Sequence, residues 1–183
     1  MVGIILLVLL VVIVIYFIGV YNGFVKMKNM VEEGFSTIDV YLKKRYDLIP
    51  NLVNTVKGYA KHESETLERV IAARNTYATA HSIQDKIANE NMMTGALSKL
   101  FALSESYPDL KANANFMTLQ GDLKKIEEDL AQARKYYNGT VKNYNTQWEV
   151  FPSVVIARIM NFQKYPYFEI KNETERENVK VEF

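Results

Sequence analysis

The hydrophobic pattern begins with an uninterrupted apolar run. Residues 2–20 are apolar apart from Tyr16 and two glycines, and the first charged side chain is Lys26. A helix of about 20 residues is roughly 30 Å long, which matches the hydrocarbon core of a bilayer. No basic residue precedes the run and no alanine occurs near its end, so the features of a cleaved signal peptide are missing. We therefore predict a retained transmembrane anchor over residues 1–22, with residues 2–21 in contact with the lipid bilayer.

The chain after the anchor shows helical periodicity. Apolar residues at spacings of three, four and seven predict a first amphipathic helix, which Pro50 is expected to end or kink: Phe24, Val31, Phe35, Ile38, Leu42 and Ile49. A second set predicts another helix: Leu52, Val56, Tyr59, Leu67, Val70 and Tyr77. A weaker third segment follows, with Asp85 near its start: Met93, Leu97, Leu100 and Phe101. Tyr107-Pro108-Asp109 then forms a turn signature.

The strongest periodicity predicts a long helix over residues 112–149. Its apolar stripe is almost heptad in spacing: Phe116, Leu119, Leu123, Ile126, Leu130, Ala133, Tyr137, Val141, Tyr144 and Trp148. A short last helix is expected after Phe151-Pro152, with Ser153 as its N-cap. No segment alternates as a strand does. The sequence thus predicts an all-α fold: an elongated antiparallel four-helix-bundle-like domain over 23–170, followed by a charged flexible tail over 171–183.

Composition and motifs narrow the chemistry. The chain has no cysteine and two histidines, which excludes disulfides, thiolate zinc sites and iron–sulfur clusters. A net charge of +1 argues against a nucleic-acid partner. Position 59, three before His62, is tyrosine, and position 66 is threonine, so neither the di-iron Glu-x-x-His motif nor His-Glu-x-x-His is present. We therefore expect no enzyme activity, no catalytic residue, no cofactor and no metal ligand.

Polar side chains on the apolar faces are the candidate site residues. Glu63 falls within the arc of the second predicted helix, with Arg74 near it, and Arg45 lies near the apolar arc of the first. An ionised carboxylate in such a place needs a partner, so we predict an ion pair between Glu63 and an arginine; the alternative is a boundary residue that reaches solvent. A polar ladder also follows the long helix: Glu127, Arg134, Asn138 and Asn145.

Short motifs spread over residues 21–168 resemble the LemA family of bacterial membrane proteins. The segments that carry the resemblance include Ile38-Asp39-Val40, Leu42-Lys43-Lys44-Arg45, Tyr46-Asp47-Leu48-Ile49-Pro50-Asn51-Leu52-Val53, Val56-Lys57-Gly58-Tyr59, His62-Glu63, Glu105-Ser106-Tyr107-Pro108-Asp109-Leu110-Lys111-Ala112, Tyr136-Tyr137-Asn138, Tyr144-Asn145 and Phe151-Pro152. Gly34 and Tyr41 depart from the family pattern. The resemblance implies an N-terminal anchor and an intracellular helical bundle, and it brings no enzymatic activity, cofactor or catalytic residue.

The function expected from these observations is a membrane-anchored interaction or scaffold protein with protein partners at the membrane. Lys26 and Lys28 follow the anchor closely, which favours a cytoplasmic C-terminal domain on the inner membrane. Candidate contact surfaces are the exposed flank of the long helix and residues 165–168, although these aromatics alternatively pack on the bundle. A competing class is a metal- or ligand-binding protein or enzyme that uses His62, Glu63 and the polar face of the long helix. A third class is a sensor in which the membrane helix transmits motion to the bundle, but this function would need a second domain to read the signal.

Overall fold

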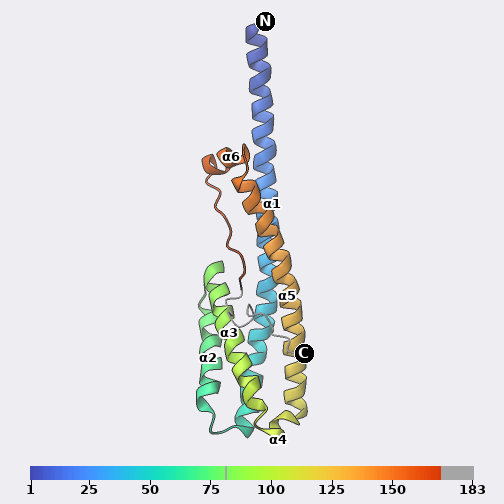
Figure 1. Cartoon of the computed structure of the whole chain (residues 1–183), viewed down its shortest axis with the longest axis vertical. Helices are drawn as coiled ribbons and strands as arrows, with labels where there is room; N and C mark the ends of the chain where they lie inside the picture. The colour runs from blue at the N-terminus through green and yellow to red at the C-terminus, as the bar shows by residue number, and fades with distance from the viewer. Residues whose placement is uncertain (81, 170–183) are drawn as a thin grey trace, which may run out of the picture. The chain divides into compact units, whose positions relative to one another are not determined.

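The computed structural model describes residues 1–80 and 82–169, and these contain helices and no strand (Figure 1). The helices are α1 (Val2–Tyr59), α2 (Ser64–Ala78), α3 (Ile83–Ser104), α4 (Pro108–Lys111), α5 (Ala114–Glu149) and α6 (Ser153–Ile159). The all-α prediction is confirmed, as is the long helix near its predicted bounds. The predicted tail over 171–183 lies outside the described residues.

Helix α1 continues through Pro50 to Tyr59, so the expectation that a helix ends at Pro50 is wrong. Leu52 and Val56 therefore belong to α1 and not to a second helix, which begins only at Ser64. A proline inside a helix costs about 3 kcal/mol. However, Ile49, Leu52, Val53 and Val56 all bury their side chains, and each such burial contributes about 1.5–3 kcal/mol. Packing on both sides of Pro50 therefore outweighs its local cost, and the chain turns only after Tyr59.

The chain divides into two compact units, and α1 and α5 contribute to both. Unit 1 contains Met1–Asp39 and Ala131–Tyr167; unit 2 contains Val40–Leu130 and, among the described residues after Tyr167, residues 168–169.

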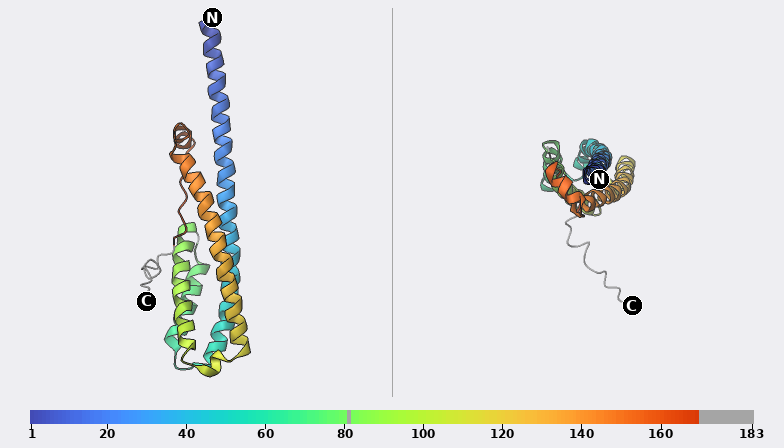
Figure 2. Two further views of the ribbon diagram at one scale, coloured as in Figure 1. Left: turned by 45° about the vertical axis from the view of Figure 1, so that its right-hand side comes forward. Right: turned by 90° about the horizontal axis from the view of Figure 1, so that it is seen from above.

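Four helices surround the apolar core of unit 2. Helices α1, α2, α3 and α5 each supply buried side chains, and Leu110 of α4 joins them. Helices α2 and α3 lie side by side along the unit 2 segments of α1 and α5 (Figure 2). The amide of Asn89 on α3 donates to the Thr76 carbonyl on α2 over 3.0 Å, which ties this pair of helices together.

Unit 1 is an antiparallel pairing of α1 and α5. The Phe24 ring on α1 lies edge-on to the Tyr144 ring on α5, with centroids 5.7 Å apart. Further along α1, the Phe35 ring lies edge-on to the Tyr137 ring, with centroids 5.8 Å apart. Residue numbers rise on α1 as they fall on α5, which establishes the antiparallel direction. At Gly34 the two backbones approach closely, because an added Cβ would lie 3.3 Å from the Tyr137 Cα.

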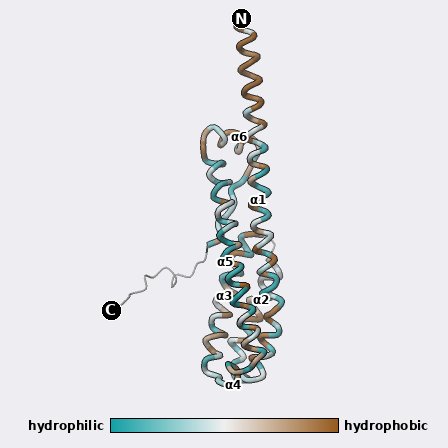
Figure 3. The backbone as a smooth tube through the Cα atoms, turned by 90° about the vertical axis from the view of Figure 1, so that its right-hand side faces the viewer, coloured by the Kyte–Doolittle hydropathy of each residue, from teal (hydrophilic) through white to brown (hydrophobic). Residues whose placement is uncertain are grey.

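The N-terminal part of α1 packs against nothing. Side chains from Val2 to Tyr16 are all exposed, and the stretch is apolar along its length (Figure 3). It is the one helix within the described residues that is long and apolar enough to cross a membrane.

Two helix starts carry side-chain caps, and a predicted third does not. The Ser82 hydroxyl accepts from the Asp85 N–H at α3, and the Asn113 amide oxygen accepts from the Phe116 N–H at α5. Ser153 is the first residue of α6 and donates to the Gln147 carbonyl over 2.6 Å. The prediction that Ser153 caps α6 is wrong, because its hydroxyl bonds back to the end of α5.

Candidate functional site: a buried charge cluster beside an apolar groove

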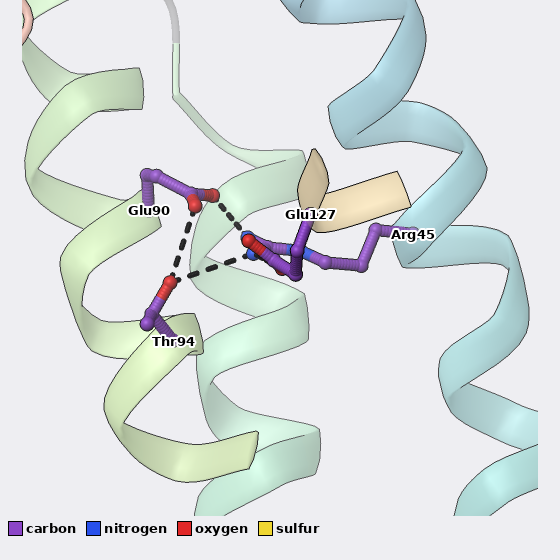
Figure 4. Close-up of polar contacts among 4 residues, drawn as sticks. All are labelled: Arg45, Glu90, Thr94 and Glu127. Atoms are coloured by element: carbon purple, nitrogen blue, oxygen red, sulfur yellow. Dashed lines mark hydrogen bonds and ion pairs between the residues drawn. The ribbon is translucent and has the colours of Figure 1, made fainter. Parts of the chain in front are cut away.

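A buried arginine links three helices of unit 2. Arg45 on α1 is 2% exposed, and its guanidinium pairs with Glu90 on α3 and with Glu127 on α5, the latter over 2.6 Å (Figure 4). Thr94 completes the cluster: its hydroxyl donates to Glu90 over 3.2 Å and lies 3.5 Å from the Arg45 Nη1. We call these four residues the charge cluster.

Electrostatics keep this arginine charged. Burial alone would lower the Arg45 pKa, but the charges of Glu90 and Glu127 and the hydrogen bonds to both carboxylates raise it above its ordinary value. Two carboxylates around one guanidinium give the cluster a formal charge of −1. Glu127 is the charged member that meets solvent, since 39% of its side chain is exposed, and Thr94 is half-buried. Solvent therefore reaches the Glu127 carboxylate but not the Glu90 carboxylate.

The predicted ion pair between Glu63 and an arginine is wrong. Glu63 is half-buried and accepts a hydrogen bond of 3.2 Å from the Tyr107 hydroxyl. Arg45 turns to α3 and α5 instead, and the Arg74 guanidinium lies over the Tyr46 ring at 4.2 Å, in cation–π geometry. Burial of Arg45 itself agrees with its position near the apolar arc.

Glu90 is the functional candidate that sequence analysis missed. It lies three residues after Ile87 and three before Met93, and all three side chains are buried. This spacing puts a carboxylate on the apolar stripe of α3. The spacing of Ile87, Glu90 and Met93 could have indicated this position, but the apolar periodicity of the segment is too weak to define its buried face.

The alternative site at His62 and Glu63 has one described side-chain hydrogen bond, from Tyr107 to Glu63. His62 is exposed. Among the described residues no three histidine, aspartate or glutamate side chains gather as metal ligands.

An apolar groove runs between α3 and α5 next to the charge cluster. Its volume is about 590 Å³, within the range of ligand-sized sites. Thr94 and Glu127 belong to both groove and cluster, so one end of the groove is polar. Gly121 leaves the wall open, because a Cβ there would meet nothing within 4 Å. The lining residues are Thr94, Leu97, Ser98, Phe101, Met117, Gln120, Gly121, Leu123, Lys124 and Glu127.

Asn145, the last residue of the polar ladder, has a structural role in unit 1. The Asn145 amide donates to the Tyr165 carbonyl over 2.9 Å and accepts from the Tyr165 N–H over 3.1 Å. Tyr137 donates to the Pro166 carbonyl over 2.8 Å, and the Tyr165 ring lies 5.1 Å from Tyr144. Residues 163–167 therefore run along α5 as a strap. The sequence allows residues 165–168 either as a contact surface for partners or as aromatics packed on the bundle. Tyr165 and Pro166 pack on the bundle.

The other predicted contact surface is exposed. Lys124, Lys125 and Glu128 on α5 all face solvent. Lys124 also borders the groove, so this flank and the groove form adjoining parts of one side of α5.

Known proteins resemble this chain over most of its length. Protein LemA of Metamycoplasma hominis is 23% identical over 167 residues, which cover 89% of this chain and 74% of that protein. Magnetosome protein MamQ of Magnetospirillum gryphiswaldense is 22% identical, and magnetosome protein MamQ 2 of Paramagnetospirillum magneticum is 24% identical, each over 177 residues. The chain spans 65% of the length of each magnetosome protein, less than two thirds. The LemA family model matches residues 34–183, and this chain belongs to the LemA family.

Proposed function

We propose that this protein is a membrane-anchored helical interaction protein. Residues 2–21 of α1 span the bilayer, and the bundle binds a protein partner in the groove between α3 and α5. The observation that carries the proposal is the complete exposure of an apolar helical stretch. Exposed apolar surface of this extent is unfavourable in water and marks a membrane or protein contact. Membership of the LemA family supports a membrane-associated helical protein.

Orientation follows from the charges beside the anchor. Lys26 and Lys28 follow the apolar stretch closely, and basic residues accumulate on the cytoplasmic side of a span. The proposal therefore places the bundle in the cytoplasm, at the inner membrane. Because the chain has no cysteine, a single Lys124→Cys variant gives a clean test. An impermeant maleimide should label it only after the membrane is opened, and labelling of intact cells would contradict this orientation.

The groove fits an amphipathic helical segment of a partner. Phe101 and Met117 supply accessible apolar surface in the groove, while Glu127 and Lys124 offer one charge of each sign at its edge. This combination matches the helix-in-groove mode of recognition, in which apolar anchors bind and flanking charges fix the register. Anchoring keeps the groove near other membrane proteins and raises its effective concentration for them.

Crosslinking in native membranes tests the interaction. A photoreactive amino acid in place of exposed Met117 lines the groove and should capture a discrete set of proteins. Gly121→Leu fills the open space beside it and should abolish capture, whereas Gly58→Leu makes the same change at an exposed glycine with open space around it, away from the groove. Equal capture by both variants would contradict binding in the groove.

Ligand binding in the same groove is the second candidate, since its volume of about 590 Å³ also suits a small amphipathic molecule. Native mass spectrometry of the detergent-purified chain separates the two. A co-purified small molecule that Gly121→Leu displaces would favour this candidate. Stoichiometric iron, zinc or manganese in the purified chain would instead favour metal chemistry.

A further inference from the structure

A second apolar surface lies at the corner between α5 and α6 in unit 1. Phe151 is 82% exposed and Ile159 is 67% exposed, although both are large and apolar. Their neighbours share this property, and we define the corner patch as Val150, Phe151, Val155, Ile159 and Met160. The other side of α6 is already packed, since Ile156 and Ala157 are buried. The short helix is thus apolar both toward the protein and away from it.

Ring contacts fix the corner beside the end of the anchor. Phe162, just after α6, stacks on Phe24 at 4.9 Å and lies 5.9 Å from Tyr21. Tyr21 directly follows the apolar run, and a helix rises only about 1.5 Å per residue. Phe162, two residues after the last member of the corner patch, therefore lies within about one turn of the point where α1 leaves its apolar stretch. The corner appears at that level in the tube view, where brown gives way to mixed colours (Figure 3).

The chemistry around the patch suits a lipid interface. Arg158 is exposed on α6, and a long basic side chain beside apolar residues can reach phosphate groups. Trp148, the single tryptophan, is half-buried nearby, and its indole N–H donates to the Phe162 carbonyl over 2.8 Å. Lys164 lies over the indole ring at 4.7 Å and pairs with Glu149 over 2.6 Å. Aromatic and basic side chains of this kind concentrate at the headgroup level of membranes.

We propose that the corner patch inserts into the headgroup region of the same bilayer that α1 spans. The inference rests on the proposed membrane anchor and adds a second, shallow contact to it. One spanning helix leaves the protein free to tilt and rotate. A second contact at the corner holds unit 1 in one orientation against the membrane, in the manner of an interfacial helix.

The test uses single cysteines carrying an environment-sensitive fluorophore, in the full chain reconstituted into phosphatidylcholine vesicles. Ile159→Cys and Phe151→Cys report on the patch, and Val11→Cys reports on the anchor. Gln132→Cys is the matched control, because it is an exposed α5 position of the same unit, 17 residues before Glu149, or about 26 Å along the helix. Parallel vesicles contain lipids brominated either near the glycerol or near the end of the acyl chain.

We expect both corner labels to be quenched about twofold by the shallow bromines and less by the deep ones, because interfacial segments lie about 5–10 Å into the headgroup boundary. The anchor label should be quenched more by the deep bromines, and the control label by neither. A quenched anchor label with corner labels that behave like the control would overturn the inference and leave the anchor standing. An unquenched anchor label would overturn both. Emission changes at the corner that depend on the protein-to-lipid ratio and not on bromine would indicate a second protein chain and also overturn the inference.

Discussion

Removing the guanidinium of Arg45 should destabilise unit 2 severely. Arg45→Met keeps a long side chain but removes the guanidinium from Glu90, which is 2% exposed and retains the hydrogen bond from the Thr94 hydroxyl. Breaking a buried pair in this way costs about 3–5 kcal/mol. For a chain of this length each kcal/mol lowers the midpoint of thermal unfolding by about 2–4 °C. The midpoint should therefore fall by about 6–20 °C.

The double variant Arg45→Met/Glu90→Met separates the charge from the packing. It replaces the buried ion pair with two apolar side chains, which is often neutral or stabilising by about 1–4 kcal/mol. Glu127 stays in place but is partly hydrated, so its loss of a partner costs only about 0–1 kcal/mol. The double variant should therefore recover most of the stability lost by Arg45→Met, and Glu127→Gln alone should have a small effect.

Circular dichroism of the full chain in detergent micelles measures the midpoints, and hydrogen exchange of α3 peptides reports on unit 2 directly. Faster exchange around residue 90 is expected in Arg45→Met and not in the double variant. An Arg45→Met midpoint equal to that of the parent chain would refute the assignment of Glu90 as a buried charge. A double variant no more stable than the single one would show that the loss comes from packing.

Three further predictions concern other contacts. Gly34→Leu should lower stability by about 1–3 kcal/mol in thermal melts, because its side chain would press on the Tyr137 backbone; an unchanged midpoint would contradict this close approach. Tyr107→Phe should cost about 0.5–1.5 kcal/mol in denaturant titrations through the lost hydrogen bond to Glu63, and a neutral result would show that this bond contributes nothing. Burial raises the pKa of Tyr137 to about 12. The unfolded chain ionises its tyrosines near pH 10, so stability from the neutral Tyr137 is complete below that pH and lost as the pH rises toward 12. Tyr137→Phe should weaken this alkaline loss in pH-dependent melts, and an identical pH profile would refute it.

Helices could be predicted wherever one face is apolar over many turns. The stripe from Phe116 to Trp148 is continuous, and α5 follows it closely. Pro50 misled the prediction because local propensity is a per-residue effect, whereas burial on both sides of it adds up over several side chains. The start of α6 was displaced by one residue because the Ser153 hydroxyl has partners on the preceding helix that no local pattern contains.

The candidate site was predictable only in part. Arg45 lies near the apolar arc of its helix, which agrees with its burial, but its partners lie 45 and 82 residues away. Helix periodicity gives the face on which a residue lies but not the helix opposite that face. The pattern therefore could not show that Arg45 pairs with Glu90, which the sequence analysis did not consider, and not with Glu63. The groove could not be predicted either, because it depends on how side chains of α3 and α5 pack beside one another, which no local pattern contains.

The strap along α5 affects how the chain meets proteases. Lys164 is exposed and precedes Tyr165, so the peptide bond between them matches the specificity of trypsin. Trypsin-like enzymes grip an extended substrate through its main-chain N–H and C=O groups, and the Asn145 side chain already occupies both of those groups on Tyr165. This bond should therefore resist cleavage until the strap detaches locally, so the rate of cutting after Lys164 measures how often unit 1 releases the segment that follows α6.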